Sequence, residues 1–177
     1  MQQQDQHRME DIAEDYVNEL IDRNVVQVVK TSTNGKVREC RLYDLVRELC
    51  IRKGKEENFL KTDMITESLL SSTKSRRYGV YSDFDRYAAS TPHLRTLLFF
   101  KLDSGSFGMP QVHFISKCFK LLRVLDFEGI EIGSLPSSFG KLTHLRYLGL
   151  RGTGLETLPT SIGNLRSLQT MDTSCLK

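Results

Sequence analysis

The sequence has few cysteines, and they are not spaced as a metal or disulfide motif requires. Cys40, Cys50, Cys118 and Cys175 lie far apart, no Cys-x-x-Cys pair occurs, and the four histidines are scattered as well. We therefore expect no metal site and no disulfide framework, which favours a reducing compartment with buried thiols. Cys40 and Cys50 are interpreted as core thiols.

Long apolar runs and a strong charge of either sign are also absent. No run approaches the roughly 20 apolar residues of a membrane-spanning helix. The opening "MQQQDQHRME" lacks the apolar stretch of a secretion signal. Residues 1–60 hold 10 basic and 12 acidic residues, and the remainder holds 15 and 10. Bulk electrostatic binding to nucleic acid is not indicated, and we expect a cytoplasmic or nuclear protein.

The residues that catalysis or phosphate binding would need are missing as well. No Ser/His/Asp or Cys/His arrangement calls for a catalytic role, so we expect no enzyme activity. The phosphate-binding pattern G-x-x-x-x-G-K-[ST] is absent, since "TNGKV" has neither the first glycine nor a hydroxyl residue after Lys36. We therefore expect no nucleotide cofactor on this chain.

What the second half contains is a repeat of 23 residues. "LRVLDFEGIEIGSLPSSFGKLTH" begins at Leu122, "LRYLGLRGTGLETLPTSIGNLRS" begins at Leu145, and a third unit begins at Leu168. A looser unit, "HLRTLLFF", begins at His93. The L-x-x-L-x-L opening at this period is the signature of the leucine-rich repeat. It predicts parallel strands stacked into a short solenoid of the α/β horseshoe type, in which each repeat buries the leucines of its neighbour.

Alternation along these strands separates an inward from an outward set of side chains. Concave faces of such solenoids commonly bind other proteins. The alternative is that the outward residues are merely solvated strand positions. The outward set consists of Val124, Asp126, Glu128, Tyr147, Arg151, Thr170 and Asp172.

The first part of the chain predicts a helix followed by a β-hairpin. "MEDIAEDYVNELIDRN", residues 9–24, spaces its apolar residues along one face of a helix, which Asn24 can end. A β-branched strand over 25–29 and a returning strand over 37–42 flank a turn at Asn34 and Gly35.

A second amphipathic helix is predicted over 43–60, with Asp44 placed to cap its start. Its apolar face consists of Leu45, Val46, Leu49 and Cys50. Helix, hairpin and helix make the latter part of an α+β winged-helix module. Between Tyr43 and Glu57 four basic residues face four acidic ones, so packing is favoured over DNA reading.

These segments resemble a known family. "MEDIAEDYVNELIDRNVVQVV" and "CRLYDLVRELC" look like the end of the nucleotide-binding region of plant intracellular immune receptors, the coiled-coil nucleotide-binding leucine-rich-repeat class. "RRYGVYSD", residues 76–83, resembles the strand that opens the family's repeats. The resemblance covers most of 9–177. It implies the following domains: a polar tail over 1–8, a winged-helix portion over 9–60, a linker over 61–75 and leucine-rich repeats over 76–177.

The resemblance implies part of a disease-resistance receptor of innate immunity. Its repeats would recognise a pathogen effector or a guarded host protein, and would restrain an ADP/ATP switch by contacting the nucleotide-binding region. The family's Met-His-Asp motif, whose His senses ADP phosphates, corresponds here to Leu42, Tyr43 and Asp44. A phenol donates a hydrogen bond but carries no positive charge. One interpretation is that Tyr43 and Asp44 sense a nucleotide. The alternative is that Tyr43 is an aromatic residue at the end of a strand and that Asp44 caps the helix.

Two other functions stay open. One is a nucleic-acid-binding winged helix with a leucine-rich accessory region, and the other is a free-standing leucine-rich decoy or adaptor. The chain stops at Lys177, inside a repeat and without a capping unit. We therefore expect it to be a piece of a longer protein, in which ADP or ATP binds upstream.

Overall fold

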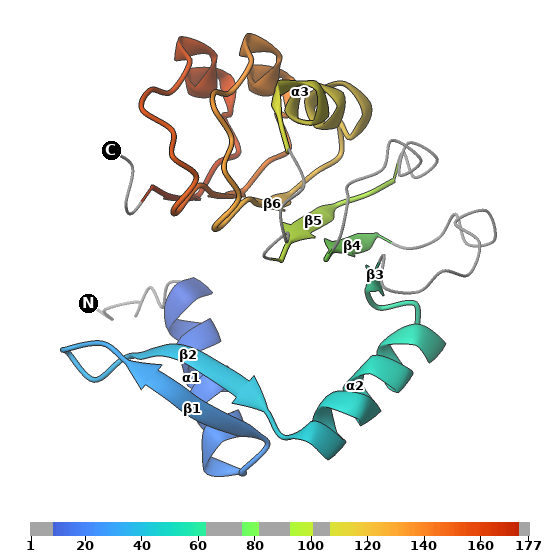
Figure 1. The fold of residues 1–177 in the computed structure, drawn as a ribbon, viewed down its shortest axis with the longest axis vertical. Helices are drawn as coiled ribbons and strands as arrows, with labels where there is room; N and C mark the ends of the chain where they lie inside the picture. Colours follow the sequence, from blue (N-terminus) through green and yellow to red (C-terminus); the bar gives the residue numbers. More distant parts are fainter. Residues whose placement is uncertain (1–8, 63–75, 82–92, 101–106, 174–177) are drawn as a thin grey trace, which may run out of the picture. The chain divides into compact units, whose positions relative to one another are not determined.

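The computed structural model describes residues 9–62, 76–81, 93–100 and 107–173. The chain divides into two compact units, 1–53 and 54–177, which we call the helix–hairpin unit and the repeat unit. Each is described by itself (Figure 1). The predicted tail over 1–8, residues 63–75 of the predicted linker, and Cys175 lie outside the described residues.

The helix–hairpin unit begins with helix α1, Met9–Asp22. Asn24 adopts a positive φ of 55° and donates its backbone N–H to the carbonyl of Ile21, so the predicted end of the helix is confirmed. Strands β1, Val26–Thr31, and β2, Val37–Leu42, pair antiparallel around the predicted turn. Gly35 has a φ of 82° there, a conformation that favours glycine.

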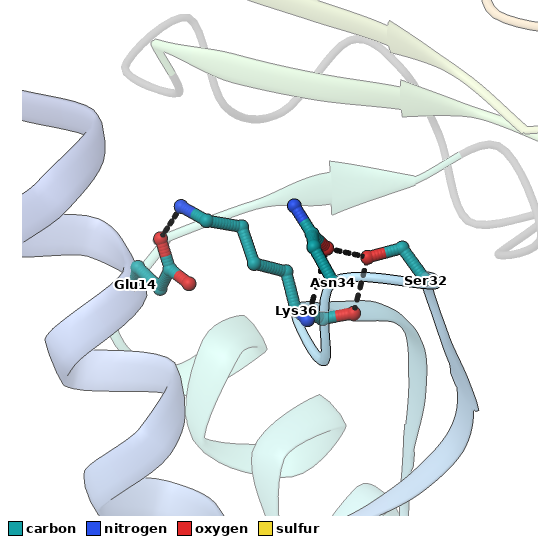
Figure 2. A network of polar contacts seen from close by, with 4 residues as sticks. All are labelled: Glu14, Ser32, Asn34 and Lys36. Carbon is teal, nitrogen blue, oxygen red and sulfur yellow. Dashed lines mark hydrogen bonds and ion pairs between the residues drawn. The ribbon is translucent and has the colours of Figure 1, made fainter.

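The hairpin turn is tied to α1 by one ion pair. The Lys36 ammonium lies 2.5 Å from a carboxylate oxygen of Glu14 on α1 (Figure 2). Within the turn, the Ser32 hydroxyl bonds to Asn34 and, at 3.1 Å, to the carbonyl oxygen of Lys36. The pair spans a shallow hollow of about 250 Å³ between helix and strand. Lys36 is mostly exposed and Glu14 is partly exposed, so the contact aligns the hairpin without fully burying a charge.

Helix α2, Asp44–Glu56, forms as predicted, but its apolar face is not covered. No residue of α2 is buried, and Leu45 is 83% exposed. The core-thiol prediction for Cys40 and Cys50 is wrong, since both are exposed. Cys40 lies on a two-stranded sheet with mostly exposed side chains, and Cys50 lies on the uncovered helix.

The cap prediction at the start of α2 is also displaced by one residue. Asp44 is the first residue of the helix, and its side chain forms no hydrogen bond with any residue that the structure describes. The backbone carbonyl of Tyr43 instead accepts the N–H of Arg47 at 2.8 Å. Tyr43 therefore holds the position that the cap prediction gave to Asp44.

The repeat unit contains a parallel sheet of six strands whose spatial order follows the chain. Each strand pairs with the next one along the sequence, as stacked repeats require. The first strand lies inside the stretch predicted as a linker. The strands are β3, Lys61–Thr62; β4, Arg77–Val80; β5, Thr96–Phe99; β6, Val124–Asp126; β7, Tyr147–Gly149; and β8, Thr170–Asp172.

Short helical segments lie on the other side of the core from this sheet (Figure 1). They are α3, Met109–Cys118, and the 3₁₀ turns η2, Ser137–Lys141, and η3, Thr160–Asn164. Each 3₁₀ turn follows a proline, Pro136 or Pro159, whose fixed φ suits the position before the first turn. Residues 134–142 and 157–165, which share the pattern [ST]-L-P-[ST]-S-x-G-x-L, are therefore the return segments of their repeats.

The core fills the space between the sheet and the helical segments. Leu97, Leu125 and Leu148 are partners in register on β5, β6 and β7, and each is 0% exposed. Two residues after Leu97 and Leu125, the rings of Phe99 and Phe127 stack with centroids 5.2 Å apart. The inward positions predicted from the repeat are confirmed, because each strand covers the apolar side chains of its neighbour. In the described residues no helix is long and apolar enough to cross a membrane.

Candidate protein-binding face

The outward face of the sheet is the side turned away from this core. The predicted strand residues fall on it in two rows, and Gly149 joins the second row. Between the rows lie the buried Leu125 and Leu148, so the side chains alternate as predicted on β6 and β7, whereas Met171 at the same position of β8 is 38% exposed. The first row is Val124, Tyr147 and Thr170, and the second is Asp126, Gly149 and Asp172, each on β6, β7 and β8.

Asp126 is the most constrained carboxylate of the second row. Burial raises its pKa, and the charge of Asp172 raises it further, while the backbone N–H of Glu128 opposes the shift by donating a hydrogen bond of 3.0 Å. A side chain at position 149 would run into the Asp126 carboxylate. Gly149 therefore leaves room for Asp126 to lie across the neighbouring strand.

Tyr147 lies in a negative environment. Burial raises the pKa of its phenol to about 12, and the charges of Asp126, Asp172 and Glu128 contribute in the same direction. At neutral pH the phenol is therefore a neutral hydrogen-bond donor. Past the strand ends, Glu128 forms an ion pair with Arg151 at 3.5 Å. The structure thus brings the predicted outward residues together on one face.

Sequence reasoning missed the outward residues of the first strands. Leu98 on β5 is the register partner of Asp126, so it belongs to the second row. Past the ends of β4 and β5, the rings of Tyr81 and Phe100 stack with centroids 4.3 Å apart and planes 12° apart. Aligning "HLRTLLFF" with the unit at Leu122 would have placed Leu98 and Phe100 on this face.

A row of four arginines along one edge of the face was also missed. Each lies just before its strand, and the backbone carbonyls of the first three accept the N–H of the next arginine, at 2.7 to 2.8 Å. The positive charges of Arg76 and then of Arg123 lower the pKa of Arg95. None of the four forms an ion pair with a described residue. This arginine row consists of Arg76, Arg95, Arg123 and Arg146.

Comparison with known proteins also divides the chain into a first part and a repeat part. Residues 1–50 match the family described as the disease resistance protein winged helix domain, and residues 93–177 match the leucine-rich repeat region. Disease resistance protein RPP13 of Arabidopsis thaliana is 40% identical over 80% of the chain and 16% of its own length. The chain belongs to the plant disease-resistance proteins.

Other relatives of this disease-resistance chain agree. RPP13-like protein 3 of Arabidopsis thaliana is 39% identical over 98% of the chain and 21% of its own length. ToMV resistance protein Tm-2(2) of Solanum lycopersicum is 35% identical over 92% of the chain and 20% of its own length. The chain therefore spans about a fifth of the length of these relatives.

The second predicted site of this disease-resistance chain lies at the junction of β2 and α2. Tyr43 is 44% exposed there, directly before Asp44, which begins the helix. Their nucleotide-sensing role stays a prediction. In the described residues, no group of three or more His, Cys, Asp and Glu side chains is arranged to hold a metal ion.

Proposed function

We propose that this chain is the part of a plant immune receptor that binds another protein through the outward face of its repeats. The repeats would stack as a leucine-rich solenoid, with the outward face on the concave side. The partner is a pathogen effector, a guarded host protein or the nucleotide-binding region of the same receptor. The observation that supports the proposal is the arginine row.

Like charges on neighbouring strands repel one another and raise the free energy of the unbound chain. Strands are about 4.8 Å apart, so successive guanidinium groups of the row repel one another unless their side chains diverge. The lowered pKa of Arg95 reflects this repulsion. A partner that presents carboxylates would reverse it, and guanidinium groups bind carboxylates in bidentate pairs. The partner surface for this row is therefore acidic.

In the intact receptor, binding at this face would restrain or release an ADP/ATP switch located outside this chain. The chain itself would act in the cytoplasm, by binding and not by catalysis. We expect no measurable ADP or ATP affinity for residues 1–177, because the phosphate-binding loop is absent from the sequence. Isothermal calorimetry that found a micromolar nucleotide site would contradict this expectation.

The arginine row is tested by charge removal. The triple variant R95Q/R123Q/R146Q should bind a labelled peptide of alternating Glu and Ser at least about tenfold more weakly than the native chain in fluorescence anisotropy. The control R38Q/R52Q/R166Q removes three exposed arginines elsewhere and should bind like the native chain. Equal losses in both variants would show non-specific attraction and overturn the proposal.

A DNA duplex serves as the competing probe. A nucleic-acid-binding protein would bind the duplex more tightly than the acidic peptide, with an affinity that falls steeply as salt is added. That result would favour the alternative of a nucleic-acid-binding protein. We expect the acidic peptide to be preferred, since a row of four arginines offers few phosphate contacts, whereas each guanidinium can bind a carboxylate in a bidentate pair.

A further inference from the structure

Beyond the arginine row, the outward face is divided into an apolar and an acidic part. Leu98 on β5 pairs in register with Asp126 on β6, so the two parts meet directly between these strands. The apolar strip consists of Tyr81, Phe100, Leu98, Val124 and Tyr147. The acidic corner consists of Asp126, Glu128 and Asp172.

The apolar strip is accessible along its length. Tyr81 is 38% exposed, and the other four side chains are half-buried, although they belong to the side of the sheet away from the core. The stacked rings of Tyr81 and Phe100 form a flat platform at one end of the strip. Contiguous apolar surface of this kind is typical of interaction sites, and aromatic rings contribute most of the contact energy there.

The acidic corner holds its charges around a position without a side chain. Gly149 lies between Asp126 and Asp172 in register and is itself buried, because the Asp126 carboxylate lies over it. Tyr147, two residues earlier on the same strand, has its pKa raised to about 12, by burial and by the three acidic groups. Glu128 already pairs with Arg151. A cation placed beside the two carboxylates would offset the repulsion between Asp126 and Asp172.

We propose that the outward face binds a segment of a partner protein in which aromatic or aliphatic side chains alternate with lysine or arginine. The apolar side chains lie on the apolar strip, and a cationic head lies against the carboxylates of Asp126 and Asp172. This inference rests on the proposed function and adds the chemistry of the partner segment. With acidic residues of the partner on the arginine row, the segment binds in one direction only.

The test compares two labelled peptides of equal length on the full chain by fluorescence anisotropy. One repeats Leu, Lys and Ser, and the other repeats Leu, Glu and Ser. The Leu/Lys peptide should bind, and the double variant D126N/D172N should weaken that binding by about tenfold. The control E131Q/E156Q removes two exposed carboxylates that lie outside the strands, and should change the affinity by less than about twofold.

A second pair of variants tests the apolar strip. Tyr81→Ser removes half of the aromatic platform, whereas Leu121→Ser removes a side chain with the same 38% exposure away from the strands. Only Tyr81→Ser should lower the affinity for the Leu/Lys peptide. Far-UV circular dichroism on each variant confirms that it is folded.

The outcomes separate the two proposals. Equal losses in D126N/D172N and E131Q/E156Q would overturn the inference, because binding would then follow net charge. Binding of the Leu/Glu peptide through the arginine row, with none of the Leu/Lys peptide, would overturn the inference and leave the proposed function standing. If neither peptide binds, both proposals fail.

Discussion

The two units carry similar apolar patterns but bury them differently. In the described part of residues 1–53, Val26 is the only buried apolar residue, whereas the repeat unit holds a continuous core. Helix α2 has an apolar face as clear in the sequence as the leucines of the repeats, yet Leu45 is 83% exposed and Leu148 is 0% exposed. A periodic pattern therefore sets which face is apolar, and a neighbouring element decides whether that face is buried.

The largest expected effect compares the same substitution in the two units. Leu148→Ala removes a buried side chain that packs beside Leu125 in register, so we expect a loss of about 2 to 5 kcal/mol in the free energy of unfolding. Leu45→Ala on α2 should change it by less than about 0.5 kcal/mol. Urea unfolding followed by circular dichroism measures both. A comparable loss at Leu45 would mean that α2 has a cover in solution and that the contrast between the units is wrong.

A smaller effect is expected where two repeats approach most closely. A methyl group on Gly140 in η2 would overlap the Ser161 backbone carbonyl and lie 2.9 Å from its Cβ, whereas Gly163, the equivalent residue of η3, has nothing within 4 Å. Gly140→Ala should therefore cost about 1 to 3 kcal/mol. Gly163→Ala should be neutral or stabilising by up to about 1 kcal/mol.

The same urea experiment measures this pair. Equal changes in the free energy of unfolding at the two glycines would show that η2 and η3 are not in close contact at Gly140. A loss confined to Gly140 would support direct stacking of consecutive repeats, because only contact between η2 and η3 distinguishes the two positions.

Much of this fold follows from the sequence, because its determinants are local or periodic. The positions of Asn24 and Gly35 predicted the helix end and the hairpin turn, and the 23-residue period predicted the buried leucines. Exposure of Cys40 and Cys50 could not be read from the pattern, since it depends on what covers the hairpin and α2.

The candidate site was predicted only in part for a related reason. The outward residues on β6, β7 and β8 follow from strict repeats, but Leu98 and Phe100 belong to a unit whose spacing is looser. The arginine row is visible as a recurring "LR" in three units, yet its significance depends on the stacking of backbone carbonyls and N–H groups in register. Rows that run across strands become visible only once the register is known.

The next prediction concerns the environment of a tyrosine in each unit. Tyr16 on α1 is 64% exposed, whereas Tyr147 lies among acids with a pKa raised to about 12. A spectrophotometric pH titration should show one phenol ionising near that value, absent from Tyr147→Phe. In D126N/D172N its pKa should fall only part of the way, because burial is the larger cause. A phenol at position 147 that ionised near the ordinary value of about 10 would contradict the half-buried site.

The same group links stability to alkaline pH. The folded pKa of Tyr147 exceeds its unfolded value, so its contribution to stability is complete below about pH 10 and is lost as the pH rises through about 12. Tyr147→Phe should lose less stability over that window than the native chain. Identical pH profiles would show that the phenol is not buried in the native state.

The smallest effect is expected at the ion pair that joins the hairpin to α1. Glu14 raises the pKa of Lys36, first through a hydrogen bond and then through its charge, so the contribution of the pair is present below the unfolded pKa of lysine and is lost as the pH rises through the raised value. The pair, drawn in Figure 2, is open to solvent, since Lys36 is 59% exposed and Glu14 is 38% exposed. A double-mutant cycle of Lys36→Gln and Glu14→Gln should therefore give a weak coupling at low salt that disappears at high salt. A coupling that survives high salt would mean that the pair is desolvated in solution, and that the helix–hairpin unit buries more than Val26, its one buried apolar residue among those described, indicates.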